Sequence, residues 1–292
     1  MHALQQVIDG MTTGSIYGAL ALALVLVYRS TGMINFAQGQ MAVLSTYLAW
    51  AMTQADVPIV PAVVLAILIA ILIGAGVERL LIRRFEGRDH LTTIIVTVGL
   101  LTTFNGVVIW LWGADLKTIP SLFPERDLSV GAIHFTLQDI GIVGVLIAVI
   151  LVMQALFRGT RLGLALRAVA DNPQSSALSG LPIGVLLMTG WALAGAVGGL
   201  GGVLIAPKIS LQPGMLDNVL TYAVAAAILG GLDSPIGAIV AAWTLGIAQN
   251  LAGTYIPLVG TDLQIAVPLV IMAVVLLIRP QGLFGRREVM RV

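Results

Sequence analysis

The sequence predicts an all-α protein, a polytopic transmembrane bundle of eight or nine membrane-spanning helices. Hydrophobic residues make up 58% of the 292 residues and charged residues only 10%, whereas soluble domains carry about 25% charged residues. Long apolar stretches almost free of charge alternate with short basic clusters. Charged side chains are costly in hydrocarbon, so they collect in the connecting loops. We therefore expect a single membrane domain over residues 1–292, with no soluble domain appended.

Apolar stretches of about 20 residues are long enough to cross the hydrocarbon core of a bilayer. The chain contains such stretches, and a shorter one near its end, at Met11–Tyr28, Met33–Thr53, Ile59–Leu80, Leu91–Trp112, Leu137–Phe157, Gly184–Ala206 and Gln264–Ile278. The connecting segment 116–136 contains prolines and charged residues. We expect this segment to form a loop outside the membrane.

Residues 219–251 allow two arrangements. The sequence GGLDSPIG at residues 230–237 favours a turn and divides the segment. About twelve helical residues before this turn rise only about 18 Å, too little to cross a core of about 30 Å. We favour a pair of short crossings over two half-helices that meet inside the protein. The second arrangement requires protein or a water-filled cavity to satisfy the unwound backbone.

The positions of the lysines and arginines predict the orientation, because cytoplasmic loops are enriched in both. Eleven of the fifteen lie within residues 79–88, 158–167 and 279–291, and Arg29 stands alone. Placing these on the inside leaves only three outside, namely Lys117, Arg126 and Lys208. We therefore expect an inner-membrane-type protein with a cytoplasmic C-terminus. Arg29 is too weak a marker to place the N-terminus.

The sequence suggests no catalytic centre. It lacks the G-x-x-x-x-G-K-[ST] phosphate loop and has no cysteine, and its three histidines are not spaced as metal ligands. Glu78 beside Arg79 is expected to form a snorkelling pair at a helix end, and Asp233 to form a turn. We expect no enzyme activity, no metal and no cofactor. The net charge of +1 argues against a nucleic-acid partner.

Three amide side chains stand together at the start of an otherwise apolar stretch, namely Asn35, Gln38 and Gln40. Asn35 and Gln38 are three residues apart, so they would share one face of a helix. Amide groups in hydrocarbon need partners and therefore point into the bundle or a cavity. Two interpretations stay open: hydrogen bonds between helices, and a lining for the path of a solute.

The internal segment 158–182 has the pattern of two short helices. The apolar face of the first helix has helical spacing and consists of Leu162, Ala165, Leu166 and Val169. Arg161 and Arg167 lie off this face. The sequence Asn172–Pro173 ends the helix, because proline restricts the residue before it.

A second short helix is expected at about residues 174–179. Gly180 suits the position after its C-terminal end, and Pro182 suits the first turn of the next span. Two short helices across the cytoplasmic face form a surface that another protein can bind. The alternative is an amphipathic loop that lies on anionic lipid.

Several segments, in the same order, resemble the permease subunits of branched-chain amino acid ABC importers. They are MINFAQGQ (33–40), RLGLALRAVADNPQSSALSGLPI (161–183), GWALAGAVGGLGGVL (190–204), AAILGGLDSPIGAIV (226–240) and IRPQGLFGRREV (278–289). The resemblance covers the chain from about Gly10 to Val289. It is closer to the shorter of the family's two permease types.

The resemblance implies an ATP-driven importer that works by alternating access. Its expected partners are a sister permease or second copy, two cytoplasmic ATPases, a periplasmic solute-binding protein and membrane lipid. The residues expected to couple the permease to the ATPases are Arg161, Arg167, Asp171, Asn172, Ala177 and Gly180. In two respects the chain departs from the pattern: Gln38 stands where the family commonly has histidine, and the internal loop lacks the EAA signature of more distant importers.

The expected solute is a branched-chain amino acid: leucine, isoleucine or valine. Relatives with similar motifs import urea, short amides or other amino acids, so these solutes stay open. A different class, an ion-coupled secondary transporter, is disfavoured because membrane-embedded carboxylates are missing from the expected spans. A passive channel for a small neutral solute is a weaker alternative, suggested by the amides near Asn35.

Overall fold

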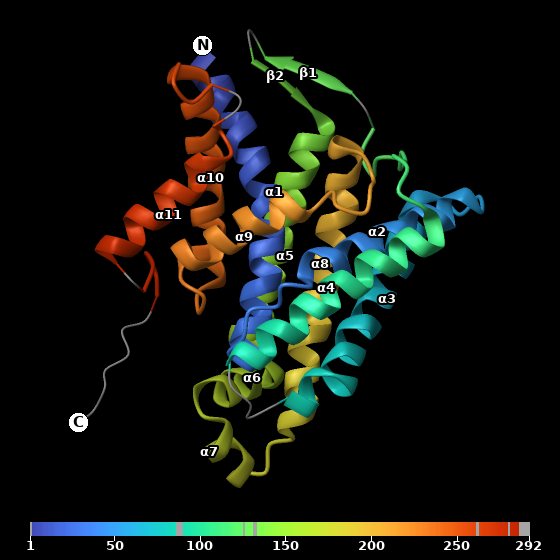
Figure 1. Ribbon diagram of the computed structural model, residues 1–292, viewed down its shortest axis with the longest axis vertical. Coiled ribbons are helices and arrows are strands. Elements are labelled where there is room, and N and C mark those ends of the chain that lie inside the picture. The colour runs from blue at the N-terminus through green and yellow to red at the C-terminus, as the bar shows by residue number, and fades with distance from the viewer. Residues whose placement is uncertain are drawn as a thin grey trace.

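The computed structural model describes residues 2–85, 90–124, 126–130, 133–260, 263–279 and 281–285. These residues form an almost entirely helical bundle, as the sequence predicts (Figure 1). The helices are α1 (His2–Thr31), α2 (Gln38–Gln54), α3 (Ile59–Leu80), the 3₁₀ helix η1 (Ile82–Phe85), α4 (His90–Trp112), α5 (Leu137–Gly159), α6 (Arg161–Asp171), α7 (Pro173–Leu178), α8 (Ile183–Ile209), α9 (Asp217–Gly230), α10 (Pro235–Tyr255) and α11 (Ala266–Ile278). The strands β1 (Asp127–Val130) and β2 (Ile133–Thr136) pair as an antiparallel hairpin.

The hairpin and the α6–α7 pair lie at opposite ends of the bundle (Figure 1). We call these the hairpin end and the α6–α7 end. Helix α1 begins at the hairpin end, where the Gln5 side chain donates to the His134 carbonyl at 2.7 Å and accepts from its N–H at 2.9 Å. Its last turn lies at the other end, with the Arg29 guanidinium 4.9 Å from the Phe157 ring. The N-terminus therefore lies on the side opposite α6 and α7.

The segment 116–136 and the region of Lys208, both expected outside the membrane, share one end of the bundle. Lys117 and Leu211 form a two-way backbone bridge, which joins the segment after α4 to the segment after α8. Lys208 forms an ion pair with Asp139 in the first turn of α5, next to the hairpin. Thr136 and Asp139 form a reciprocal capping box that starts α5.

Glycines allow the closest helix contacts in the bundle. A Cβ on Gly14 of α1 would lie 2.6 Å from the Ala242 carbonyl oxygen of α10, and one on Gly74 of α3 would overlap the Trp191 carbonyl oxygen of α8. In membranes, small residues bring helix backbones together, because dispersion and not water exclusion drives their packing. The α1–α10 and α3–α8 contacts hold the bundle together.

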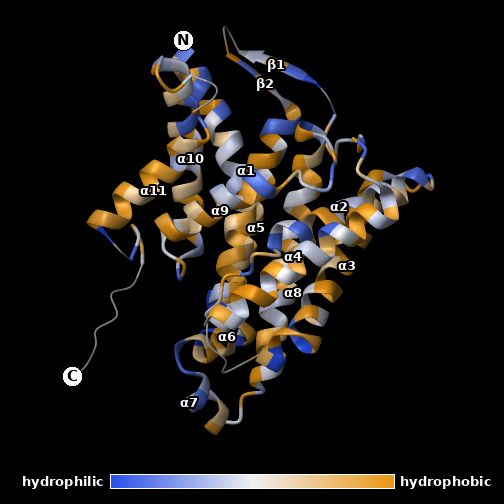
Figure 2. Cartoon of the chain, in the orientation of Figure 1, coloured by the Kyte–Doolittle hydropathy of each residue, from blue (hydrophilic) through white to orange (hydrophobic). Residues whose placement is uncertain are grey.

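Six of the described helices are long and apolar enough to cross a membrane, and α9 and α11 are shorter apolar helices. Many exposed side chains of α3, α4 and α11 are hydrophobic (Figure 2). The predicted total of eight or nine spans is therefore approximate. The segment 219–251 does not form two short crossings: α9 has 14 residues and begins inside the bundle, whereas α10 has 21 residues, enough to cross.

The second predicted span is also shorter than expected. Helix α2 starts at Gln38 and has 17 residues, so the non-helical residues 32–37 carry the chain back into the bundle after α1. The Gln38 side chain donates to the carbonyl oxygen of Ala194 at 3.0 Å. Ala194 is the twelfth of the 27 residues of α8. Helix α2 thus begins near the middle of α8, and not at the membrane surface.

Candidate functional site

The three amides form a buried, hydrogen-bonded cluster at the start of α2. All three side chains are inaccessible, at 0% exposure. The Asn35 amide donates to Gln38 Oε1 at 3.1 Å, and its Oδ1 accepts from the Ala37 N–H at 3.0 Å. Asn35 therefore precedes the helix and shapes its entry, so the prediction that Asn35 and Gln38 share a helix face is wrong.

Gln40 links this cluster to the start of α9. Its Nε2 donates to Asp217 Oδ1 at 3.0 Å, and its Oε1 is buried without a partner among the described residues. In this conformation the three amides form hydrogen bonds within the protein, as expected for hydrogen bonds between helices. A role of Asn35, Gln38 and Gln40 in lining a solute path stays a prediction.

The α6–α7 pair forms as the sequence predicts. The Thr160 hydroxyl accepts from the Gly163 N–H and caps α6, and the Asn172 side chain accepts from the Ser175 N–H at 2.9 Å and caps α7. Pro173 occupies the first turn of α7, where its missing N–H costs nothing. Gly180 follows with φ +80°, a conformation that favours glycine.

The buried face of α6 differs from the predicted face at one position. Leu166 and Val169 are buried as expected, but Leu162 is 38% exposed. Gly163 is buried in its place, against the backbone of Leu156 and Phe157. The missing side chain of Gly163 lets α6 fold back closely onto the end of α5.

Most of the expected coupling residues lie on the surface of the α6–α7 end. Arg167 is half-buried and its Nε lies 3.4 Å from the Gly163 carbonyl oxygen, and five others are exposed, namely Arg161, Asp171, Asn172, Ala177 and Gly180. Leu178 at the end of α7 is 91% exposed. The sequence interpretation missed this residue, although a leucine in the polar helix PQSSAL was a signal of a contact surface.

An ion pair at the end of α3 also contacts the start of α8. The Arg83 guanidinium donates to both carboxylate oxygens of Glu78, at 3.1 and 2.8 Å, and also to the Gly184 carbonyl oxygen. The Glu78 side chain is fully buried and that of Arg83 is 36% exposed. The predicted Glu78–Arg79 pair is therefore wrong, because the chain turns after α3 and brings Arg83 back to Glu78.

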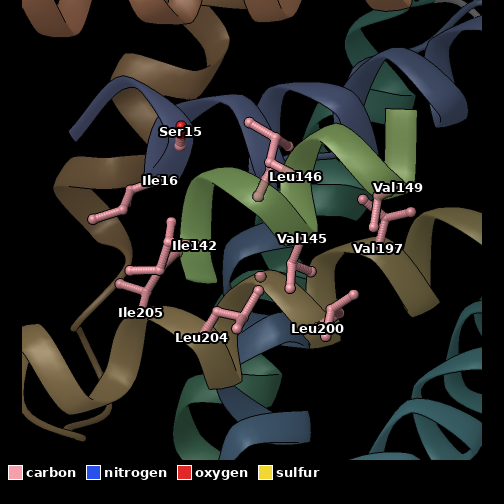
Figure 3. A pocket seen from close by; sticks show the side chains of 12 residues that line it. Ser15, Ile16, Ile142, Val145, Leu146, Val149, Val197, Leu200, Leu204 and Ile205 are labelled. Carbon is pink, nitrogen blue, oxygen red and sulfur yellow. The ribbon is translucent and has the colours of Figure 1, made fainter. Parts of the chain in front are cut away.

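An apolar pocket lies among α1, α5 and α8 (Figure 3). It contains about 320 Å³ of empty space, part of it open to the surroundings. Its one polar side chain, Ser15, already donates to the Met11 carbonyl and accepts from the Trp243 Nε1–H. Binding sites for polar solutes need several converging polar groups, so this pocket does not have the chemistry of an amino acid site.

The helix lengths and apolar surfaces define a multi-pass membrane protein. A family model described as "Branched-chain amino acid transport system / permease component" matches residues 6–278. The chain therefore belongs to this family of transport permeases, which are not enzymes.

Curated relatives match along the whole chain. The high-affinity branched-chain amino acid transport permease protein BraD of Pseudomonas aeruginosa is 28% identical over 305 residues, covering 100% of this chain and 98% of BraD. The corresponding protein LivH of Escherichia coli K12 is 28% identical over 312 residues, with the same coverage. A solved structure titled "PsaBC from Streptococcus pneumoniae in complex with Fab" is similar in fold, with a TM-score of 0.50, 14% identity and coverage of 96% and 93%.

Proposed function

We propose that this chain is the membrane-spanning permease subunit of an ATP-driven ABC importer for branched-chain amino acids. Family membership and the full-length relatives support the solute class. The proposed complex contains a second permease copy or a sister subunit, two cytoplasmic ATPases and a periplasmic binding protein. Alternating access moves the solute across the bacterial inner membrane.

The basic residues of two clusters support an orientation with the α6–α7 end in the cytoplasm. Arg83, Arg84, Arg158 and Arg161 lie in or beside the elements at this end, and positive charge is retained on the cytoplasmic side. The N-terminus and the hairpin then face the periplasm. Helix α11 starts on the hairpin side, and the segment after it pairs with the end of α9 through the Leu283 N–H and the Leu229 carbonyl. This course supports a cytoplasmic C-terminus.

The observation that carries the proposal is the exposed α6–α7 pair. Both helices are capped by side chains, and the leucine at the tip projects from the bundle. Burial of this apolar side chain in an interface would be favourable, so Leu178 is suited to contact a partner protein. ATP-driven closure of the ATPases against this surface would bias the bundle between outward-open and inward-open states, provided that the ATPases bind the two states differently.

Leu178→Asp tests this docking role. We expect the substitution to reduce the ATPase recovered with the purified complex about tenfold or more, since burying a leucine side chain contributes about 1.5–3 kcal/mol. Uptake of radiolabelled leucine into liposomes with enclosed ATP should fall to background. Leu116→Asp is the matched control, because Leu116 is 69% exposed at the opposite end. ATPase recovery and uptake equal to those of the native complex would contradict the docking role.

The same liposomes distinguish the transporter classes. ATP-dependent leucine uptake that survives collapse of the ion gradients by ionophores is expected for the importer. Uptake that persists without ATP and stops with the ionophores would identify an ion-coupled transporter instead. Replacing leucine by urea or a short amide tests the alternative solutes of the family.

A further inference from the structure

The segment from the end of α8 into α9 exposes polar residues and buries apolar ones. Between residues 210 and 221 every exposed residue is polar or glycine, and every buried one is apolar. We call the exposed set the polar strip; it consists of Ser210, Gln212, Gly214, Asp217, Asn218 and Thr221. Such a pattern is typical of a water-facing surface.

The inner part of this strip lies about midway between the hairpin end and the α6–α7 end, although its residues are exposed. Asp217 bonds to Gln40, two residues beyond Gln38, which itself contacts the middle of α8. One turn further along α9, the Tyr222 ring lies 4.9 Å from the ring of Tyr17, the sixteenth of the 30 residues of α1. The start of α9 is visible as a hydrophilic patch between the two ends of the molecule (Figure 2). The strip thus runs from the hairpin end to about mid-depth.

The polar strip is unlike the surfaces that face lipid. The exposed side chains of α3 and α4 are mostly apolar, for example Leu72 at 69% and Val98 at 44%. The exposed Thr102 and Thr103 of α4 donate their hydroxyls to carbonyls of their own helix. A carboxylate in contact with the bilayer centre costs about 2.5–3.5 kcal/mol on insertion scales. The exposed Asp217 and Asn218 therefore need contact with water or another protein, and not with lipid, whereas the Thr221 hydroxyl donates to the Asp217 carbonyl of its own helix.

We propose that the polar strip lines the outer half of the solute path, and that the Asp217 carboxylate contacts the ammonium group of the transported amino acid. The inference rests on the proposed function, in which a second permease supplies the opposite wall. Polar groups at membrane depth mark substrate pathways, because a water-filled cavity removes the cost of burying them.

Asp217 has the acceptor groups that an ammonium ion needs. Gln40 occupies Oδ1 of the carboxylate, and among the described residues no side chain bonds Oδ2. The neighbouring Gln40 Oε1 also lacks a partner. A primary ammonium carries three N–H donors, and a bond to a carboxylate is charge-assisted and therefore stronger than a neutral one.

The same face of α9 becomes apolar after Thr221. The next residues at helical spacing are Val224 and Ile228, both half-buried. An apolar constriction excludes water until it widens. These two residues thus form the inner limit of the polar strip in this conformation.

Cysteine labelling tests the path, and the native chain contains no cysteine that would react. We expect Asn218→Cys in the assembled complex to react at least about tenfold faster with a hydrophilic, membrane-impermeant thiol reagent than Leu72→Cys, because thiols in apolar surroundings are protonated and unreactive. Mass analysis of this subunit measures the reaction. Equal reactivity of the two cysteines would overturn the path.

Protection of this cysteine tests the ammonium contact. Leucine and isopentylamine, which both carry the amino group, should slow the labelling of Asn218→Cys, whereas 4-methylpentanoate, which lacks it, should not. Asp217→Asn in the same background should abolish the protection, measured as the ratio of the labelling rates with and without solute. Equal protection by 4-methylpentanoate, or protection that survives Asp217→Asn, would overturn the role of Asp217.

The labelling and protection measurements test the inference separately from the proposed function. Labelling and protection require no ATP, so a positive result together with ion-driven uptake would reject the ABC importer but keep the path. ATP-driven uptake with an unreactive Asn218→Cys would reject the path alone. In that case the polar strip is a contact surface for the second permease.

Discussion

Replacing Arg83 by alanine is expected to lower the free energy of unfolding by about 3 kcal/mol, because it leaves a buried carboxylate without its counter-ion. Glu78 is fully buried, and Arg83 provides two hydrogen bonds to it. The estimate is at the lower end for buried pairs because the Arg83 side chain is 36% exposed. Denaturant titration of the purified protein in detergent measures the loss.

Two further variants show whether the loss comes from the uncompensated charge. Arg84→Ala is the matched control, since the adjacent Arg84 is exposed and forms no ion pair with any residue that the structure describes. Adding Glu78→Gln to Arg83→Ala should recover most of the stability, because the buried group is then neutral. An Arg83→Ala protein as stable as Arg84→Ala would contradict the structural role of the pair.

Gly74→Ala is the second substitution with a large expected effect. The new methyl group would overlap the Trp191 backbone, so α3 and α8 must separate. Overpacking of this kind costs about 1–3 kcal/mol, and more when backbone must move. We expect a lower midpoint of thermal unfolding in detergent and a lower yield of folded protein.

Gly76 provides the control for this substitution on the same helix. A Cβ at Gly76 would meet no atom within 4 Å, and alanine is favoured over glycine in helices by about 1 kcal/mol. Gly76→Ala should therefore leave the stability unchanged or raise it slightly. Similar losses for both variants would show that close approach at Gly74 does not explain the α3–α8 packing.

The helices with strong local signals could be predicted from the sequence. Length and hydropathy identified the long spans, and Asn172–Pro173 placed the boundary between α6 and α7, because capping and proline geometry act within a few residues. Gly180 was correctly placed after α7 for the same reason. Comparison of Arg and Lys positions also grouped the loops correctly, since Lys117 and Lys208 lie at the same end.

The candidate site could be predicted only in part. The amides were identified as a cluster, but their burial depends on Ala194 and Asp217, which lie 156 and 177 residues further along the chain. The polar strip was not predicted, because alternation between exposed and buried residues in an irregular segment has no helical period. The partner of Glu78 was missed because it depends on the turn through η1.

The sequence by itself determined that the chain is a helical membrane protein, where its long helices lie and which loops share a side. The reason is that a span must match the thickness of the hydrocarbon core and that lysine and arginine are enriched in cytoplasmic loops, and both properties follow directly from the sequence. Only the tertiary structure decided where the N-terminus lies, how deep α2 and α9 begin, and which polar groups are buried or exposed. Those features come from contacts between distant segments, and packing and hydrogen bonding outweigh local preference there.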